Sequence, residues 1–430
     1  MKTRIVTLKN KVKLIHTYIK EVSGVELVLS FNAGAINDPM GKAGVAHFSE
    51  HALASAFSTE RYTRLERREI ATKFNYHNAS TSLRSMNFYG TSNRRNFEQL
   101  MDFCTDAFSG MKYLPEDFES EKPIIIDEIL TRRKTNERVR YRALLKHVFK
   151  EKESKNTSEG IAGSVESFNK IKIEDLKTFI SNYITQENLK IIITGHITLK
   201  DAIKLANKYV IGRVPVKNKK GFDFEDYKGY KKPNYVHVEA PEQQKSLISI
   251  IYQYSEAQKI KDLREDCVLA LFSKCLSEKV LAFYRLEKEF CYSSTGYVSD
   301  DNKCNICEII IQCNDDNAVK AINEYKNFLK YLKEHFTVEL FEKQKQKMLD
   351  AVDFDLASIH HTTYKNIIDF EYYNKVITSK QIKKSVESIT FDDLLKLYEE
   401  IFKVQPHVLV VSSNKEFDNF DYKKFIKEIK

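Results

Sequence analysis

The sequence predicts an α+β protein built from two similar domains. The main evidence is an approximate internal repeat, in which Ser-Val-Glu-Ser at 164–167 and again at 385–388 is followed by a helical pattern and then by an apolar strand. A charged stretch with glycines, prolines and little periodicity lies between the two copies, as expected of a linker. Helical and strand patterns follow one another in mixed order in each half. We expect domains at 1–213 and 236–430, joined by a linker at 214–235.

The composition of the 430 residues limits the classes of partner. Hydrophobic residues make up 42% of the chain and aromatic residues 12%, which is enough to fill the cores of two domains. The net charge of +9 is spread along the chain, a pattern more typical of a lysine-rich solvated surface than of a nucleic-acid interface. No run of about 18 apolar residues occurs, so we expect no membrane-spanning helix.

The start of the chain and its cysteines indicate the compartment. Residues 1–16 alternate apolar and polar side chains as a β-hairpin does, and they lack the apolar core of a signal peptide. The seven cysteines lie mostly within apolar segments, which fits reduced thiols. Cys304 and Cys307 have no second cysteine pair or histidine nearby, so a structural role is favoured over metal binding. We predict a cytoplasmic protein with neither nucleic acid nor membrane as partner.

The remaining elements follow from periodicity. An apolar run from Gly24 predicts a buried strand, and a loop rich in turn formers separates it from the helix around residues 47–51. Further helices are expected at Thr63–Phe74, Asn96–Met111, Ile173–Tyr183 and Thr390–Ile401, and strands at 75–92, Leu189–Thr194 and Val408–Val411.

A long helical pattern from Pro115 to Phe149 contains two acidic residues of interest. Glu121 and Glu128 are two helical turns apart and therefore share a face. Pro123 lies between them, and a proline inside a helix costs about 3 kcal/mol. We therefore expect the helix to begin near Ser120, with Pro123 in its first turn.

Residues 47–51, His-Phe-Ser-Glu-His, form the clearest chemical motif. On a helix, His47, Glu50 and His51 project from one face because they are three and four residues apart. Two imidazoles at this spacing can share a divalent metal, and the carboxylate between them is placed to deprotonate a water. The order H-x-x-E-H is that of the inverted zincin motif. On the motif alone, two ordinary helical histidines remain the alternative.

Taken together, these residues resemble the pitrilysin/insulinase family of zinc peptidases, in particular its short members such as the mitochondrial processing peptidase and its bacterial relatives. The stretch AGAINDPMGKAGVAHFSEHALA is similar to the family's metal-helix region, ESEKPIIIDEI to the helix with its glutamate ligand, and NLKIIITGHI to the closing strand of its first domain. The resemblance implies that each domain packs helices on a mainly antiparallel sheet, and that the two domains form half of a clamshell chamber.

The resemblance also implies a catalytic site with one zinc ion per chain. Its metal ligands would be His47, His51 and Glu128. Three protein ligands leave a fourth position for water, as a catalytic zinc site requires. Glu50 would be the general base that takes a proton from this water and passes it to the leaving amine. Glu121 would orient a ligand histidine, and its alternative is a solvated carboxylate on a charged helix.

Two further matches concern the substrate. Asn78, Ala79 and Thr81 are similar to the family's edge strand beside the zinc, on which an extended peptide is laid as an added strand. In the second half, SEKVLAFYRLEKEFCYSSTGY is similar to the segment that sends an arginine and a tyrosine into the chamber. These residues would be Arg285, which could bind peptide carbonyls, and Tyr292, whose hydroxyl could stabilise the oxyanion.

The length of the chain predicts a partner. Long members of the family enclose a chamber within one chain, so a chain of half that length must take the other half from a second subunit. The resemblance implies a homodimer, or a heterodimer with a related subunit, in which Arg285 and Tyr292 reach the zinc site of the opposite subunit.

The sequence departs from the family pattern at several positions. Ser49 stands where a leucine is common, and the usual Phe-Lys-Gly-Thr continuation and the glycine-rich loop near the linker are missing. His77 lies near the predicted site and would either line a pocket or be an ordinary surface histidine. His360 and His361 fit a polar helix terminus.

Two functions follow from these observations. The first is a zinc endopeptidase that cleaves short unfolded peptides, or leader segments of precursors, inside the chamber. The second is a non-catalytic subunit that shapes the chamber and presents substrate to an active partner. A complete set of metal-binding residues favours the first function, because a non-catalytic subunit has no need of it.

Overall fold

The protein is described here by a computed structural model that covers residues 2–132, 135–148, 159–217, 221, 231–240, 245–256, 262–301, 304–353 and 358–429. These residues form two compact units. Unit 1 takes its residues from 1–131, 155–226 and 357–376, and unit 2 from 132–154, 227–356 and 377–430. Most of the predicted linker lies outside the described residues, and the predicted domain boundaries stay a prediction.

Unit 1 is built on a six-stranded sheet with the strand order β1-β2-β6-β3-β5-β4. All neighbouring strands are antiparallel except β2 and β6, which are parallel. The strands are β1 (Lys2–Thr7), β2 (Lys13–Tyr18), β3 (Gly24–Phe31), β4 (Tyr76–Thr81), β5 (Met86–Asn93) and β6 (Leu189–Gly195).

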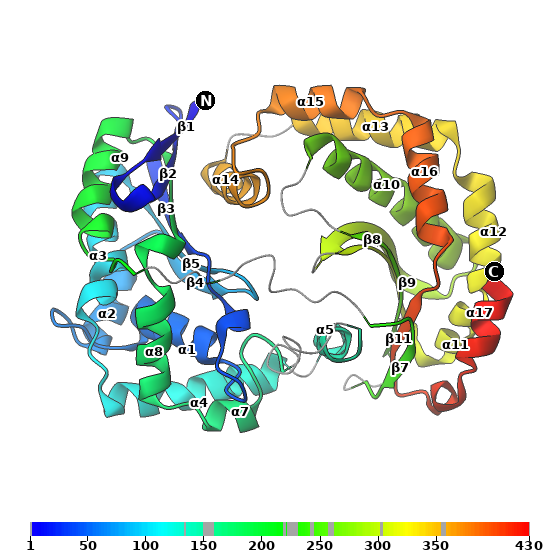
Figure 1. The fold of residues 1–430 in the computed structure, drawn as a ribbon, viewed down its shortest axis with the longest axis horizontal. Coiled ribbons are helices and arrows are strands. Elements are labelled where there is room, and N and C mark those ends of the chain that lie inside the picture. Colours follow the sequence, from blue (N-terminus) through cyan, green and yellow to red (C-terminus); the bar gives the residue numbers. More distant parts are fainter. Residues whose placement is uncertain are drawn as a thin grey trace. The chain divides into compact units, whose positions relative to one another are not determined.

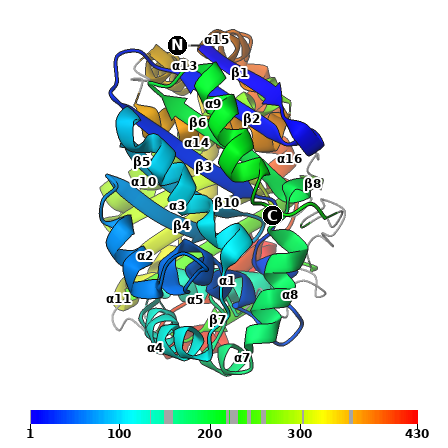
Figure 2. The same ribbon diagram turned by 90° about the vertical axis from the view of Figure 1, so that its left-hand side faces the viewer.

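Helices cover both faces of this sheet. Val25, Leu27 and Leu29 of β3 point into a large core with most of the helices of the unit, whereas Val28 points to the opposite face. There it packs against Phe370 of α14, which Figure 1 shows on the side of the sheet away from α3 and α9. The helices of the unit are α1 (Val45–His51), α2 (Arg64–Ala71), α3 (Phe97–Gly110), α4 (Pro115–Arg132), α7 (Val165–Asn169), α8 (Ile173–Tyr183), α9 (Leu199–Leu205) and α14 (Ile359–Tyr373). Figure 2 shows α3, α8 and α9 in front of the strands.

Unit 2 repeats this plan with a five-stranded sheet in the order β7-β11-β8-β10-β9. Only β7 and β11 are parallel. The strands are β7 (Tyr235–Val238), β8 (Lys245–Glu256), β9 (Cys291–Asp301), β10 (Cys304–Asn314) and β11 (His407–Val411). The helices are α5 (Asn136–His147), α10 (Leu263–Leu281), α11 (Asp315–Asn323), α12 (Tyr325–His335), α13 (Val338–Asp353), α15 (Ser379–Glu387), α16 (Phe391–Phe402) and α17 (Tyr422–Ile429).

The two sheets correspond strand by strand. β7, β11, β8, β10 and β9 of unit 2 take the places of β2, β6, β3, β5 and β4 of unit 1, and the single parallel pair falls at the same place. Among the described residues, one helix packs on the second face of each sheet: α14 in unit 1, and α5 in unit 2, where Leu144 and Val148 pack against Ile251 and Leu409. The predicted α+β class, with two similar units and mainly antiparallel sheets, is confirmed.

The helix that packs on the second face of each sheet, α14 or α5, comes from the other half of the sequence. α14 belongs to unit 1 although it follows most of unit 2 in the chain, and α5 belongs to unit 2 although it follows α4. The domains predicted from the sequence are continuous stretches, and no sequence pattern indicates this exchange.

The predicted start of α4 near Ser120 is wrong. The helix begins at Pro115 and contains Pro123 in its interior. Pro115 takes the first helical position, where the missing N–H costs nothing, and Pro123 is tolerated because Phe118 and Ile125 anchor the helix in the core on both sides of it. The prediction of one strand at 75–92 is wrong as well. This segment forms two strands, β4 and β5, joined by a turn in which Ser82 N–H donates to Ser85 C=O.

Candidate metal centre

The helix α1 carries the predicted motif, and a buried aspartate fixes its start. Asp38, in the loop before α1, accepts hydrogen bonds from the backbone N–H groups of Gly44 and Ala46, both at 2.7 Å. Gly44 precedes the helix with a φ of 105°, a conformation that favours glycine. The side chain of Phe48 is stacked between the rings of Phe118 and Phe168, at centroid distances of 4.8 and 5.2 Å. The short helix is thus held from its N-terminus and from its core-facing side.

His47 and His51 converge on one carboxylate oxygen of α4. The Oε2 atom of Glu128 lies 3.2 Å from Nε2 of His47 and 3.5 Å from Nε2 of His51. The two imidazole rings are 4.7 Å apart between centroids, as expected for positions i and i+4 of one helix. The structure therefore brings together the three residues that the sequence analysis named as metal ligands.

These separations fit a zinc ion. Zinc is held at about 2.0–2.2 Å by nitrogen and oxygen donors, so neighbouring donors of a tetrahedral site lie roughly 3.3 Å apart. The two distances from Glu128 to the histidines bracket this value. Among the described residues, His47, Glu50 and His51 also form the one group of three side chains of ligand type whose donor atoms all lie within 4.8 Å. Two imidazoles and one carboxylate are a donor set that leaves a fourth position open.

Glu121 lies behind the site and holds the ring of His51. Its Oε1 accepts from Nδ1 of His51 at 2.9 Å, which turns Nε2 of the same ring toward Glu128. Its Oε2 accepts from Nη2 of Arg68 at 2.7 Å and lies 3.7 Å from Nη2 of Arg64. The side chain of Glu121 is only 4% exposed. Each oxygen of this carboxylate thus has its own partner, and its orientation is fixed from both ends.

Glu50 is held by the edge strand β4. Thr81 Oγ1 donates to Oε2 of Glu50 at 2.7 Å, and the same oxygen lies 3.4 Å from Nδ1 of His47. The sequence analysis named Thr81 as a substrate-binding residue. In the structure its hydroxyl instead contacts the proposed general base, so any contact of Thr81 with a peptide would use its main chain.

The carboxylates and histidines shift one another's pKa values. Burial lowers the pKa of His51, but Glu121 and Glu128 outweigh it and raise the pKa to about 9. Burial likewise lowers the pKa of His47, and Glu128 and Glu50 raise it above its ordinary value. For Glu50 and Glu121 burial raises the pKa, yet contacts with the histidines bring it below the ordinary value. The cluster therefore stabilises positive charge between its carboxylates, which suits a divalent cation.

The strand β4 lies at the edge of the sheet and presents a backbone amide on its free side. Ala79 lies opposite Phe88 of β5, and the sheet order ends at β4. Ala79 N–H donates to Oδ1 of the neighbouring Asn78 at 2.9 Å, so this amide is directed to a side chain and not to β5. Asn78 Nδ2 donates to Tyr76 Oη at 3.1 Å. A side chain, rather than another strand, thus occupies this edge position.

Arg285 and Tyr292 lie in unit 2 and contact each other. Arg285 is in the π-helical turn Ala282–Glu287 that continues α10, and Tyr292 is in β9. The guanidinium of Arg285 stacks over the Tyr292 ring at 5.0 Å from its centroid, and Tyr292 is 83% exposed. The structure therefore brings these two predicted residues together as an exposed pair, in a different unit from the metal centre.

Two arginines hold elements of the candidate metal centre, and the sequence pattern singles out neither of them. Arg67 is fully buried, and its guanidinium donates to four carbonyls of the turn after α1, those of Ala52, Leu53, Ala54 and Phe57. Arg68 on the same helix binds Glu121, as described above. The sequence offered only a basic stretch for α2, and its capping box at Thr63 predicts a helix start but not which arginine is buried.

Two histidines near or outside the motif have structural roles. His77 of β4 packs edge-on against the Phe103 ring at 5.0 Å, and burial, aided by Arg67, lowers its pKa to about 4. It is thus neither an exposed surface histidine nor a member of the metal group. His360 lies in the first turn of α14, as expected of a polar helix terminus, and its Nδ1 lies 3.0 Å from Oε1 of the buried Glu26.

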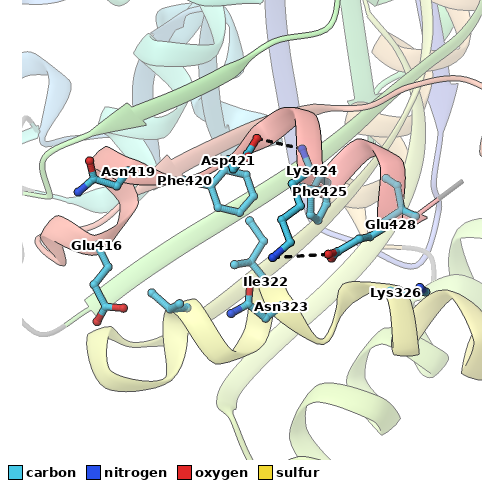
Figure 3. A pocket seen from close by; sticks show the side chains of 12 residues that line it. Ile322, Asn323, Lys326, Glu416, Asn419, Phe420, Asp421, Lys424, Phe425 and Glu428 are labelled. Carbon is cyan, nitrogen blue, oxygen red and sulfur yellow. Dashed lines mark hydrogen bonds and ion pairs between the residues drawn. The ribbon is translucent and has the colours of Figure 1, made fainter.

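A separate hollow of about 230 Å³ occurs in the helix layer of unit 2, between α11 and α12 on one side and α17 on the other (Figure 3). Its apolar lining includes Ile322, Phe420 and Phe425, and Lys424 extends across it toward Glu428. It contains none of the predicted site residues.

Two sequence models of one peptidase family match the chain. The model described as "Insulinase (Peptidase family M16)" matches residues 11–160, and the model described as "Peptidase M16 inactive domain" matches residues 170–348. The chain belongs to the M16, or pitrilysin/insulinase, family of peptidases. The first match contains the metal centre, and the second contains Arg285 and Tyr292.

One M16 relative covers nearly the full chain, and another covers about half of it. A Rickettsia bellii protein named as an uncharacterized zinc protease is 19% identical over 412 residues, which are 95% of this chain and 97% of the relative. The beta subunit of the mitochondrial-processing peptidase of Neurospora crassa is 23% identical over 209 residues, 49% of this chain and 43% of that subunit.

Solved structures share the fold. A Helicobacter pylori protease superposes with a TM-score of 0.79 at 17% identity, over 96% of this chain and 99% of that one. The periplasmic protease PqqL of Escherichia coli superposes with a TM-score of 0.81 at 16% identity, over 100% of this chain but only 50% of PqqL. This M16 chain is therefore a short, two-domain member. No helix in the described part of the chain has the length and apolar character needed to cross a membrane.

Proposed function

We propose that this protein is a zinc-dependent endopeptidase that cleaves short unfolded peptides or leader segments of precursor peptides. The observation that carries the proposal is the convergence of His47 Nε2 and His51 Nε2 on Glu128 Oε2, at separations that suit one zinc ion per chain. Relatives named as zinc proteases support it.

The residues around the metal position have separable roles. When bound, zinc would polarise the scissile carbonyl and make a water more acidic. Glu50, held in place by Thr81, accepts the proton of the attacking water and later delivers it to the leaving amine. Glu121 keeps the His51 ring in the tautomer whose Nε2 is free to bind the metal, and Arg68 keeps Glu121 in place.

The substrate is an extended peptide that adds to the free edge of β4. The Ala79 amide points to this edge, and a peptide carbonyl would replace the Asn78 side chain as its acceptor. Binding through the main chain places few demands on the peptide sequence. The scissile bond would lie beside Glu50 because Thr81, the last residue of the same strand, contacts that carboxylate.

A second subunit would complete the site. This chain spans half of PqqL, and the mitochondrial-processing peptidase relative is named as a subunit, so a homodimer or a heterodimer with a related chain is supported. In the dimer we assign Arg285 to peptide carbonyls and Tyr292 to the oxyanion at the metal centre of the opposite subunit, within a clamshell chamber. The exposure of Tyr292 supports a role toward a molecule outside its own unit.

The compartment is also part of the proposal. The six cysteines whose side chains the structure describes are free thiols. Reduced cysteines are typical of cytoplasmic proteins, which supports the cytoplasmic location predicted from the sequence.

The alternative function is that of a non-catalytic or partner-dependent subunit of a heterodimeric peptidase. The description of the second matching model as an inactive domain favours it for unit 2. The preserved metal group of unit 1 favours an active chain.

Metal analysis and a peptide-cleavage assay on the wild type and the Glu50→Gln variant test the proposal. We expect about one zinc per chain in both proteins. We expect cleavage of a quenched fluorescent peptide by the wild type and at least about a hundredfold loss in the variant, because only the proton acceptor is removed. A wild type that is metal-free and inert on every peptide, alone and with related subunits from the same organism, would establish the alternative.

A further inference from the structure

Tyr292 is exposed because it is the extra residue of a β-bulge. Along the antiparallel pair of β9 and β10, Ser293 lies opposite Gln312, but the next residue of β10, Cys313, lies opposite Cys291. Tyr292 therefore has no partner of its own in the ladder. The burial pattern agrees, since Tyr292 and Ser293 are both exposed although successive residues of a regular strand point to opposite faces.

The same bulge turns Cys291 toward Cys313. Without the extra residue, Cys291 would point outward, whereas with it both cysteines point into the core of unit 2, where they are 9% and 5% exposed. Residues directly opposite in an antiparallel pair have Cβ atoms about 4.5–5.5 Å apart, and a disulfide needs about 3.5–4.5 Å. A small approach of the two strands at the bulge is therefore enough for bond formation.

The other described cysteines lack this arrangement. Cys307 lies opposite Val298 in the same strand pair. Cys267 and Cys275 are eight residues apart on α10, about 12 Å along one helix. Cys104 is in unit 1. Cys291 is also the most exposed of the six.

The surroundings of the pair favour reaction at Cys291. Burial raises the pKa of both thiols, but at Cys291 a hydrogen bond with Ser294 and the charge of Arg285 act in the opposite direction. The hydroxyl of Tyr284 lies nearby and is buried without a hydrogen-bond partner. It interacts electrostatically with both cysteines. The surroundings of the two thiols therefore include a polar group as well as apolar side chains.

We propose that Cys291 and Cys313 form a reversible disulfide that responds to hydrogen peroxide and alters the presentation of Tyr292. The effect on peptide cleavage rests on the proposed function, whereas bond formation does not. Drawing the strands together at the bulge moves the backbone on either side of Tyr292, and with it the stacked pair of Tyr292 and Arg285. Disulfides that form in cytosolic proteins are usually transient and redox-sensing, which matches this role.

The reaction proceeds in two balanced steps. The Cys291 thiolate attacks one oxygen of hydrogen peroxide, the O–O bond breaks, and a sulfenic acid forms with release of hydroxide, which takes up the proton lost by the thiol to give water. The Cys313 thiol then attacks the Cys291 sulfur, the S–O bond breaks, and the hydroxyl leaves as a second water. Two thiols are oxidised by two electrons, and one peroxide is reduced. A dithiol such as dithiothreitol reverses the bond by exchange.

Mass spectrometry of the full-length zinc-loaded protein tests bond formation. The protein is treated with hydrogen peroxide, its free thiols are alkylated under denaturing conditions, and the peptides are mapped. We expect two of the seven thiols to be lost, one peptide pair joined through Cys291 and Cys313, and full recovery with dithiothreitol. Retention of all seven thiols, a bond between other cysteines, or irreversible oxidation of Cys291 alone would overturn the proposal.

Variants link the bond to catalysis. Peroxide should lower peptide cleavage by at least about tenfold in the wild type and in Cys307→Ser, a matched control in the same strand, but not in Cys313→Ser or Cys313→Ala. The zinc content should stay constant, because the metal centre contains no cysteine. A bond without any change in cleavage would refute the effect on Tyr292. If the oxidised protein forms the bond but the reduced protein cleaves no peptide, the proposed function is refuted instead.

Discussion

The two units share a sheet order but differ in the helix that follows the corresponding strands β3 and β8. In unit 1 this helix is α1, whose seven residues include buried His47 and Glu50. In unit 2 it is α10, whose 19 residues bury Leu271, Phe272 and Leu276 instead. The same architecture thus supports a polar cluster in one unit and an ordinary apolar core in the other, and the chemistry depends on a few positions on one helix.

The edge strands of the two units differ in a related way. In unit 2 the amide of Val298 in β9 donates to Oγ of Ser273, a side chain of α10 that closes this position of the edge. In unit 1 the corresponding strand β4 has only its own Asn78 side chain at the amide of Ala79. A neighbouring side chain can rotate away, whereas Ser273 is fixed by its own helix. The edge of unit 1 is therefore the one that we expect to accept a peptide.

The largest expected effect tests what unit 2 contributes to peptide cleavage. Arg285→Ala should lower peptide cleavage about a hundredfold while one zinc per chain is retained, because the change removes a substrate contact and leaves unit 1 intact. Metal analysis and initial rates measure the two quantities.

Mixing the Arg285→Ala and Glu50→Gln variants tests whether Arg285 of one subunit serves the metal centre of the other subunit. After subunit exchange, half of the dimers are mixed and each has one intact site, so about a quarter of the wild-type activity should return. Each variant mixed with itself is the control. No recovery despite demonstrated exchange would show that Arg285 serves the metal centre of its own chain.

A smaller effect concerns the contact between the edge strand and the general base. Thr81→Ala removes the hydroxyl that donates to Glu50, so kcat should fall about tenfold while KM and zinc content stay nearly constant. Thr81→Ser keeps the hydroxyl and should restore most of kcat. If KM rises and kcat does not change, the Thr81 side chain instead contacts the substrate.

The smallest effect on catalysis is expected at the proline of α4. Pro123→Ala restores a backbone N–H in the helix interior and should raise the free energy of unfolding by about 1–3 kcal/mol, measured by denaturant unfolding with a zinc chelator present. Pro115→Ala, at the first helical position, should change it little. Glu121 and Glu128 flank Pro123, so the substitution could shift them slightly, but neither side chain is removed. Cleavage should therefore fall only a few-fold. A loss of stability would show that Pro123 itself is required for packing.

The proximity of the proposed metal ligands could be predicted because its signals are local or strongly patterned. His47, Glu50 and His51 lie within one helical turn and a half, and Glu128 could be placed by family resemblance on a second helix. The partners of these residues could not be predicted, since they depend on how separate elements pack. Nothing in the sequence shows that Thr81 reaches Glu50 or that Arg68 reaches Glu121.

Two features, the start of α4 and the bulge in β9, could not be predicted because they depend on packing and strand register that a sequence pattern does not show. The start of α4 was misplaced because the cost of an internal proline was weighed without the core contacts of Phe118 and Ile125 that offset it. The bulge that exposes Tyr292 and turns Cys291 inward could not be predicted, because one extra residue changes the face of its neighbours and leaves no clear mark in a strand pattern.

The exchange of α5 and α14 between the two halves of the sequence sets an order of events during synthesis on the ribosome. The sheet of unit 1 has all its strands once residue 195 has emerged, but the face that contains Val28 and Ile192 stays uncovered until α14 follows, more than 160 residues later. At about 5–20 residues per second this interval lasts roughly 10–30 s. For that time the nascent chain displays an apolar sheet face, and a chaperone that binds such surfaces has a defined period in which to act.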